Sequence, residues 1–145
     1  MTTAEHIETI DRLRACGFPK TRTRSGQVTS GPGYHLAELG ESRWYGDEDP
    51  ADRIEGEERV SAEYGALAQA LTGRWGAADL VWTRGMLERA GTGDRLAEPW
   101  QELSGTTDHL HLWRVAPHWV ALYAAQWGAD HSPQLMAAVT VTDPP

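Results

Sequence analysis

The chain has 145 residues, a length that suits one domain of ordinary size with a single hydrophobic core. Its composition is 40% hydrophobic and 23% charged, with seven tryptophans, which excludes an intrinsically disordered polymer. A net charge of −8 disfavours nucleic acid and anionic membranes as partners, because both would be repelled.

The start of the chain and its cysteine usage lead us to expect a cytoplasmic protein. Glu5, Glu8 and Asp11 occupy the stretch where a signal peptide would have its apolar core. No apolar run approaches the roughly 18 residues that cross a bilayer. The one cysteine, Cys16, can form no internal disulfide, so the fold needs no oxidising compartment. We expect Cys16 to be a small buried hydrophobe.

The first third of the chain predicts a helix, a basic loop and a hairpin. Residues 4–16 place apolar side chains three positions apart, which indicates a short helix that ends at Gly17. Residues 20–33 are basic and almost free of apolar side chains, so they predict a flexible loop or a poorly buried ribbon. They lack the motif of a phosphate-binding loop. Residues 34–48 alternate well enough for a hairpin that turns at residues 39–42.

An acidic stretch over residues 46–59 carries seven acidic residues against two arginines. Its spacing partly matches a calcium-binding loop, but Ala51 offers no oxygen ligand and Asp52 stands where such a loop turns on glycine. We therefore interpret Asp49 as the N-cap of a helix that begins at Pro50. The excess of acidic charge also predicts a surface that attracts a basic partner, with Asp47, Glu48 and Asp49 as candidate contacts.

The central helix continues to Gly73 with an apolar stripe that we expect to lie on a sheet. Residues 78–91 predict a brief strand followed by a helical turn, and residues 91–100 predict a turn. The stripe consists of Val60, Tyr64, Leu67, Leu71 and Trp75.

The last third of the chain predicts three antiparallel strands, over residues 109–115, 119–127 and 135–141. A tight turn centred on Pro117-His118 would sort the first two strands into two faces, both largely apolar. We expect the helix of residues 58–73 to cover the first face. The first face bears His109, His111, Trp113, Val115, Val120, Leu122 and Ala124, and the second bears Leu110, Leu112, Arg114, Trp119, Ala121, Tyr123 and Trp127.

The second face is the candidate docking surface. It groups Trp119, Tyr123 and Trp127 around Arg114, and aromatic side chains with an arginine are enriched where proteins bind one another. The alternative is that the helix of residues 4–16 covers this face, since layer packing allows it equally well. The same surface would also allow a homodimer, so both a monomer and a homodimer remain open.

His109 and His111 form a candidate metal site. Side chains two residues apart on a strand point the same way, about 7 Å from one another, which suits two zinc ligands. His131, with Asp130 beside it, follows the second strand at the near end and could supply a third ligand. His118 would lie at the far end of the hairpin. The alternative is that these are ordinary histidines of a sheet that binds no cofactor.

Motifs of nucleophilic catalysis and of zinc proteases do not occur in the sequence. The short first helix, the acidic-capped central helix, the exit "TGRWG" and the closing segment "HLWRVAPHWVALYAAQWGADHSPQLMAAVTV" together resemble small, mostly uncharacterised bacterial α+β proteins. Some of these are similar to toxin-immunity proteins or to secretion-chaperone-like domains. The resemblance implies partner binding without catalysis, and it carries over no functional residue.

These observations predict one α+β domain over residues 1–145. An antiparallel sheet, made from the C-terminal three-strand meander and an N-terminal hairpin, packs against two or three helices. The leading hypothesis for function is a non-enzymatic interaction domain that binds a partner protein through the aromatic sheet face and the acidic patch. The alternative is a small-ligand binder or an enzyme with a histidine-lined pocket that could hold zinc.

Overall fold

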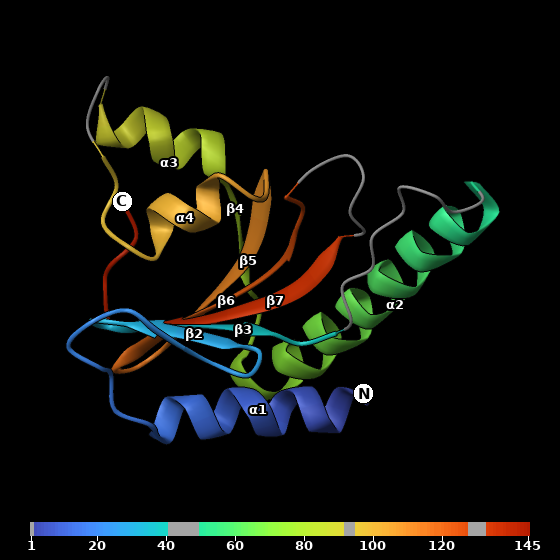
Figure 1. Ribbon diagram of the computed structural model, residues 1–145, viewed down its shortest axis with the longest axis horizontal. Helices are drawn as coiled ribbons and strands as arrows, with labels where there is room; N and C mark the ends of the chain where they lie inside the picture. The colour runs from blue at the N-terminus through green and yellow to red at the C-terminus, as the bar shows by residue number, and fades with distance from the viewer. Residues whose placement is uncertain (1, 41–49, 92–94, 128–132) are drawn as a thin grey trace.

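The computed structural model describes residues 2–40, 50–91, 95–127 and 133–145 (Figure 1). It confirms the α+β class. The helices are α1 (Thr3–Ala15), α2 (Pro50–Trp75), α3 (Thr83–Ala90) and α4 (Trp100–Ser104). The strands are β1 (Thr23–Ser25), β2 (Val28–Gly31), β3 (Tyr34–Glu38), β4 (Asp79–Trp82), β5 (His109–Val115), β6 (His118–Ala125) and β7 (Gln134–Thr140). None of the helices described is both long and apolar enough to cross a membrane.

The seven strands of the described residues join one antiparallel sheet in the order β1-β2-β3-β7-β6-β5-β4. The last strand in the chain, β7, lies at the centre, where it pairs with β3 on one side and β6 on the other. Every residue of β7 is buried, which fits its nearly continuous apolar sequence. β1 and β4 are the two outer strands of this sheet.

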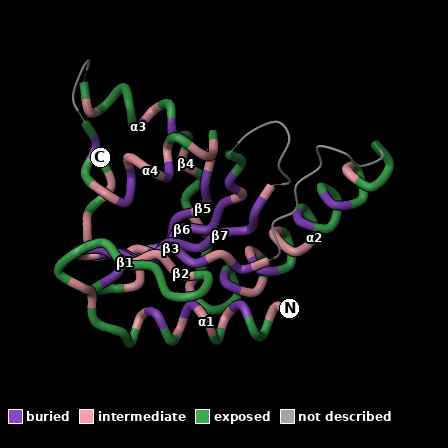
Figure 2. Tube along the Cα trace, viewed as in Figure 1, coloured by how far each residue is buried: buried purple, intermediate pink, exposed green. Residues whose placement is uncertain are grey.

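The helices form a layer on each side of the sheet (Figure 1). α1 and α2 lie on one side, and we call the sheet surface beneath them the α1–α2 face. α3 and α4 lie on the other side, over the α3–α4 face. Each face has its own apolar core, and Figure 2 shows the buried residues concentrated in the strands between the two helical layers. The sheet is therefore the shared wall of two cores.

The two helices of the α1–α2 face follow their sequence patterns. α1 begins with a capping box, in which Thr2 Oγ1 accepts from the backbone of Glu5 and the Glu5 carboxylate accepts from the backbone of Thr2. α2 begins at Pro50 as predicted, whereas its expected cap lies outside the described residues. The predicted stripe of α2 faces the sheet: Val60, Leu67 and Leu71 are buried, and Tyr64 and Trp75 are half-buried.

The three C-terminal strands confirm the predicted meander, with one change of register. Val115 pairs with His118, so the tight turn is Ala116-Pro117 and not Pro117-His118. The pairing therefore shifts by two residues, and a shift of two leaves each side chain on its predicted face because the strand period is two. α2 covers the face predicted for it.

The N-terminal hairpin differs from the prediction. β3 pairs with β2, and the two strands turn at Pro32-Gly33, where Gly33 adopts the positive φ of +83° that such a turn requires. Residues 20–33 are thus largely a ribbon that belongs to the sheet and not a loop. The second strand expected after β3, near Trp44, falls on residues that the structure does not describe.

The structure differs from the sequence predictions for the second face, which was expected to be open or else covered by the helix of residues 4–16, and for Cys16, which was expected to be buried. The α3–α4 face is covered by α3 and α4, whereas the helix of residues 4–16 lies with α2 on the opposite face. α4 was not predicted, because its five residues bury only Trp100 and Leu103 and are too few for a helical period. Cys16 is exposed, since α1 ends at Ala15 and the chain leaves the core there. The strand and helix predicted over residues 78–91 are confirmed as β4 and α3.

Candidate functional site

The outer strand β4 leaves part of the α1–α2 face open to solvent. Within the described chain β4 pairs with β5, with Leu80 opposite His111 and Trp82 opposite His109. All four side chains stand on the α1–α2 face. α2 packs over β5, β6 and β7, while Leu80 and Trp82 on the edge are 54% and 56% exposed. An uncovered apolar pair on a sheet edge is uncommon in a soluble domain, because edges favour association with other chains.

Aromatic and imidazole rings continue from this edge under α2. The Trp82 ring lies 5.4 Å from the His109 ring, and the Tyr64 ring of α2 lies 5.2 Å from the His111 ring and 6.5 Å from the His109 ring, between centroids. We call Leu80, Trp82, His109, His111 and Tyr64 the β4-edge cluster. It joins an exposed part on β4 to a half-buried part beside α2.

Tyr64 holds His111 in a defined orientation. The Tyr64 hydroxyl donates to the carbonyl oxygen of Leu122 at 2.9 Å, and its oxygen lies 2.6 Å from His111 Nδ1. Burial raises the pKa of Tyr64, so the hydroxyl keeps its proton. Burial also lowers the pKa of His111, and the charge of His109 lowers it further. His111 is therefore a neutral imidazole at pH 7.

A carboxylate borders the exposed part of the cluster. Asp108 Oδ1 accepts from His109 Nδ1 at 2.7 Å, and the Asp108 side chain is 83% exposed. Asp79 is exposed at the first position of β4. Beside Trp82 and His109, the surface thus combines an apolar side chain with the carboxylate of Asp108, whereas Asp79 stands on the opposite face of β4. An apolar group beside an acidic one attracts partners that carry apolar and positively charged groups together.

The residues predicted to form an aromatic docking face do not gather on one open surface. Tyr123 is 2% exposed and lies in the core under α4, and burial raises the pKa of its hydroxyl. Arg114 lies 4.9 Å over the Trp119 ring, whose Nε1 donates to Asp143 at the C-terminal end. Trp127 is 50% exposed, beside a cleft of about 290 Å³ near the β1–β2 ribbon. The prediction that this face is open is therefore wrong for Tyr123, because α3 and α4 cover the face on which Tyr123 stands.

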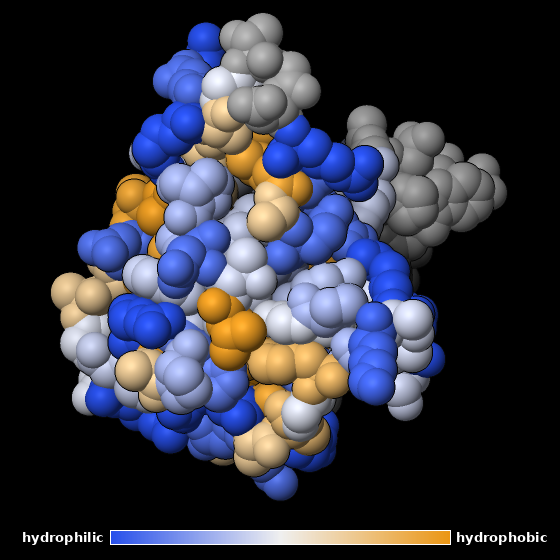
Figure 3. Space-filling model, turned by 90° about the vertical axis from the view of Figure 1, so that its left-hand side faces the viewer, coloured by the Kyte–Doolittle hydropathy of each residue, from blue (hydrophilic) through white to orange (hydrophobic). Residues whose placement is uncertain are grey.

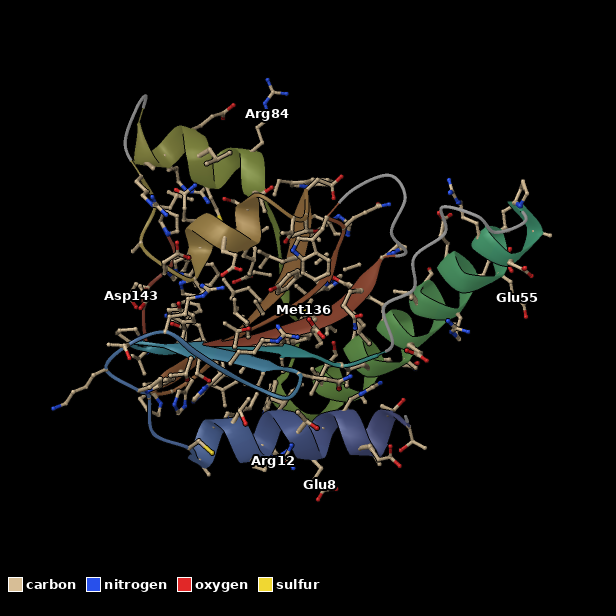
Figure 4. The ribbon with its side chains drawn as sticks, in the orientation of Figure 1. Glu8, Arg12, Glu55, Arg84, Met136 and Asp143 are labelled. Carbon is tan, nitrogen blue, oxygen red and sulfur yellow. The ribbon has the colours of Figure 1, made fainter. Side chains whose placement is uncertain are left out.

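The predicted acidic contacts Asp47, Glu48 and Asp49 lie outside the described residues. The neighbouring acidic positions on α2 are described. Asp52 and Glu55 are exposed, and Glu55 points away from the body of the molecule on the end of α2 that extends beyond the sheet (Figure 4). Acidic charge is therefore displayed along this end of the helix.

The predicted metal ligands are only partly described. His109 and His111 lie on the same face of β5, as predicted, whereas His131 and Asp130 fall on residues whose structure is not described. Among the described residues, no group of three or more histidine, cysteine or carboxylate side chains is placed to hold a metal ion.

A second histidine site, which we did not predict, lies where α1 meets the β1–β2 ribbon. Ser30 Oγ and His35 Nδ1, on paired positions of β2 and β3, are 2.6 Å apart, and the Phe18 ring stacks on His35 at 4.8 Å. Ser30 and His35 line an open cleft of about 620 Å³ at the exit of α1, with Cys16 at its wall. The sequence "GPG" at residues 31–33 was the available signal, because a hairpin turning there places these two side chains opposite one another.

Figure 3 shows the hydropathy of one side of the molecule. Hydrophilic residues cover much of that side, and apolar residues form small groups between them.

Comparison of the chain with family models, curated proteins and solved structures finds no match.

Proposed function

We propose that this protein is an interaction domain that binds a partner protein through the edge strand β4. The observation that carries the proposal is the exposure of Leu80 and Trp82, 54% and 56%, on one face of an outer strand of the sheet. Tryptophan is among the side chains most enriched at the energetic centres of interfaces. Burial of both side chains by a partner would remove their apolar surface from water, which favours association.

The partner that fits this edge is an extended, basic segment of another protein. The outer side of a sheet edge offers backbone N–H and C=O groups that a second strand can pair with. The carboxylate of Asp108, which contacts His109 opposite Trp82, favours lysine or arginine beside an apolar residue of that strand. The net charge of −8 would also speed the approach of a basic protein.

The proposed function is of the class expected from the sequence, partner binding, but the proposed contact surface is β4 and not the aromatic face predicted from the sequence. Arg114, Trp119 and Trp127 stay predicted contacts, and their side of the molecule is distinct from β4. Trp127 is a useful comparison because its exposure, 50%, is close to that of Trp82. The same substitution at the two tryptophans therefore compares two surfaces at nearly equal loss of exposed area.

The experiment captures partners from cells that produce the protein, purifies each, and measures its affinity for the wild type, Trp82→Ala and Trp127→Ala. Trp82→Ala is expected to weaken binding about 30-fold or more, the effect of losing a residue worth about 2 kcal/mol. Trp127→Ala is expected to change the affinity less than about threefold. Hydrogen exchange of the complex should show protection at residues 79–82.

Two results would contradict the proposal. One is an affinity that Trp82→Ala leaves unchanged while Trp127→Ala reduces it, which would support the surface predicted from the sequence. The other is a captured partner that leaves hydrogen exchange of β4 unaltered. Circular dichroism of both variants controls for folding, since both side chains are half-exposed. Light scattering on the wild type shows whether the occupant of β4 is a second copy of the chain.

A further inference from the structure

We propose that the partner segment adds to β4 as an antiparallel strand of a defined pattern. From its N-terminal to its C-terminal end, that strand carries an apolar residue, a spacer residue, a second apolar residue and a basic residue. This proposal rests on the proposed function, because β4 is the contact strand of that function. It specifies in addition which backbone groups of β4 pair with the partner and which partner residue faces each side chain.

One hydrogen bond at the end of β4 determines which of its backbone groups point away from the sheet. The N–H of Thr83 donates to the carbonyl oxygen of Asp108 at 3.0 Å, directly after the pair of Trp82 with His109. Opposite residues of an antiparallel ladder alternate between pairs that exchange hydrogen bonds and pairs that do not. The pair of Trp82 with His109 therefore exchanges none, and neither does the pair formed by Leu80, two residues earlier.

The backbone N–H and C=O groups of Leu80 and Trp82 thus point to the open side of β4. Within the part of the chain that the structure describes, no hydrogen bond reaches these groups. The side chains of the same two residues are 54% and 56% exposed. Unpaired backbone groups and exposed apolar side chains therefore coincide on the same residues, which is what strand addition to a sheet edge requires.

An antiparallel partner would place one residue directly opposite Leu80 and another directly opposite Trp82, and each would exchange two backbone hydrogen bonds with β4. Directly opposite side chains share a face, so these two partner residues pack on Leu80 and Trp82 and are expected to be apolar. The spacer residue stands opposite Val81, whose side chain packs against the core of the α3–α4 face. All six strand pairs of the described sheet are antiparallel, and antiparallel pairs are slightly the more stable per residue.

Asp79 determines where the partner carries its basic residue. Asp79 is exposed at the first position of β4, and its side chain stands on the face opposite to that of Leu80. In an antiparallel partner, the residue that faces Asp79 comes directly after the residue that faces Leu80. A lysine or arginine at that position would form a cross-strand ion pair with the Asp79 carboxylate. A parallel partner would need its basic residue before the two apolar ones, so the order of residues reports the direction of the strand.

The first measurement tests the backbone geometry in the full-length protein without any partner. By NMR, the amide of Val81, which faces β5, should exchange with solvent at least about tenfold more slowly than the amides of Leu80 and Trp82. Leu80 or Trp82 amides as strongly protected as that of Val81 would overturn the proposal, because the edge would then offer no free groups.

The second measurement uses two capped synthetic peptides of one composition. The peptide Thr-Ile-Thr-Ile-Lys-Thr has the proposed order, and Thr-Lys-Ile-Thr-Ile-Thr is its reverse. The first should bind about two- to fivefold more tightly, the range of an exposed ion pair, and should slow exchange at Leu80 and Trp82. Asp79→Asn should remove the difference between the peptides. Equal or tighter binding of the reversed peptide by the wild type, or no binding of either, would overturn the proposal.

Methylation of single peptide nitrogens tests the hydrogen bonds directly. A methyl group on the nitrogen of either isoleucine removes a donor that faces β4, so each change should weaken binding at least about tenfold. A methyl group on the nitrogen of the threonine between them is the matched control and should change binding less than about threefold, because that nitrogen faces away from β4. The opposite result would show parallel pairing and contradict the proposal.

Failure of this proposal can be told apart from failure of the proposed function. A captured partner that depends on Trp82 while the peptides contradict the pattern would leave the function standing and overturn only the strand pattern. Peptides that follow the pattern while captured partners bind elsewhere would do the reverse.

Discussion

Lowering the pH from 7.5 to 5.5 is expected to destabilise this protein, because three histidines are buried without full hydrogen bonding beneath or beside α1. His6, His35 and His118 are 1%, 4% and 9% exposed. Both ring nitrogens of His6, Nε2 of His35 and Nδ1 of His118 have no hydrogen-bond partner. A proton added to any of these rings would bury a charge that the surroundings solvate poorly.

The charged groups around each ring do not reverse this effect. Burial is the largest influence and lowers the pKa of all three histidines. For His6 the nearby carboxylates of Glu63 and Glu5 oppose it in part, and for His35 two backbone carbonyls do so. For His118 the charges of Arg14, Arg114 and His35 add to the lowering.

The sign and size of the effect follow from proton binding. The unfolded chain binds these protons near the ordinary histidine pKa of 6.5, whereas the folded chain binds them only at lower pH. Stability is therefore full above pH 6.5 and falls as the pH decreases below it. One histidine that stays neutral when folded costs at most about 1.4 kcal/mol between pH 7.5 and 5.5, so three cost at most about 4 kcal/mol. This is a large part of the 5–15 kcal/mol that stabilises an ordinary domain.

Urea unfolding at half-unit steps between pH 7.5 and 5.5 measures the effect. The free energy of unfolding should decrease steadily below pH 6.5, with a corresponding uptake of protons on unfolding. His118→Gln should reduce this pH dependence, because one titrating group is lost. A free energy of unfolding that stays constant or rises toward pH 5.5 would refute the reasoning, as would an identical slope in the variant.

Further predictions concern stability and reactivity. Leu67→Ala, in the core beneath α2, should lower the free energy of unfolding in urea by about 2–5 kcal/mol. Leu80→Ala, on the open edge, should change the same free energy by less than about 0.5 kcal/mol. Equal effects of the two substitutions would contradict the burial of Leu67 and the exposure of Leu80. Arg22→Ala removes two hydrogen bonds to Glu102, at 2.7 and 2.9 Å, yet should cost no more than about 1 kcal/mol because the pair is half-exposed. Cys16 should react with a disulfide reagent in the folded protein, and full protection until unfolding would show that it is buried.

Patterns that repeat within one element were predicted correctly from the sequence. The stripe of α2 faces the sheet as expected, because a helix of 26 residues gives many turns in which the period is visible. The alternation along β5 and β6 assigned each side chain to the right face, although the turn between them was placed one residue too late. The error was harmless because it moved the register by two positions.

Features that depend on how distant elements meet were not predicted. Nothing in α1 itself decides which face of the sheet it covers, since its apolar stripe would fit either one. Burial of Tyr123 depends on Trp100 and Leu103, which lie in a helix too short to be recognised from periodicity. The docking face expected around Tyr123 was lost for this reason.

The sequence predicted that the two histidines of the β4-edge cluster share a face, but it did not predict the contact of Tyr64 with His111 or the exposure of Trp82. Alternation placed His109 and His111 on one side of a strand, but Tyr64 was expected only as part of an apolar stripe. Its hydrogen bond to His111 joins residues 47 positions apart, which no local pattern reveals. The exposure of Trp82 likewise depends on strand order, because the same sequence would be buried in the middle of a sheet.

The two edges of the sheet differ in a way that bears on the proposed function. β1 is polar and exposed throughout, and its Arg24 forms an ion pair with Glu38, features that discourage pairing with another strand. β4 instead exposes Leu80 and Trp82. A net charge of −8 makes copies of the chain repel one another, which opposes the self-association that an open apolar edge invites. The same charge attracts a basic partner, so acidity and the open edge together would favour a foreign strand over a second copy.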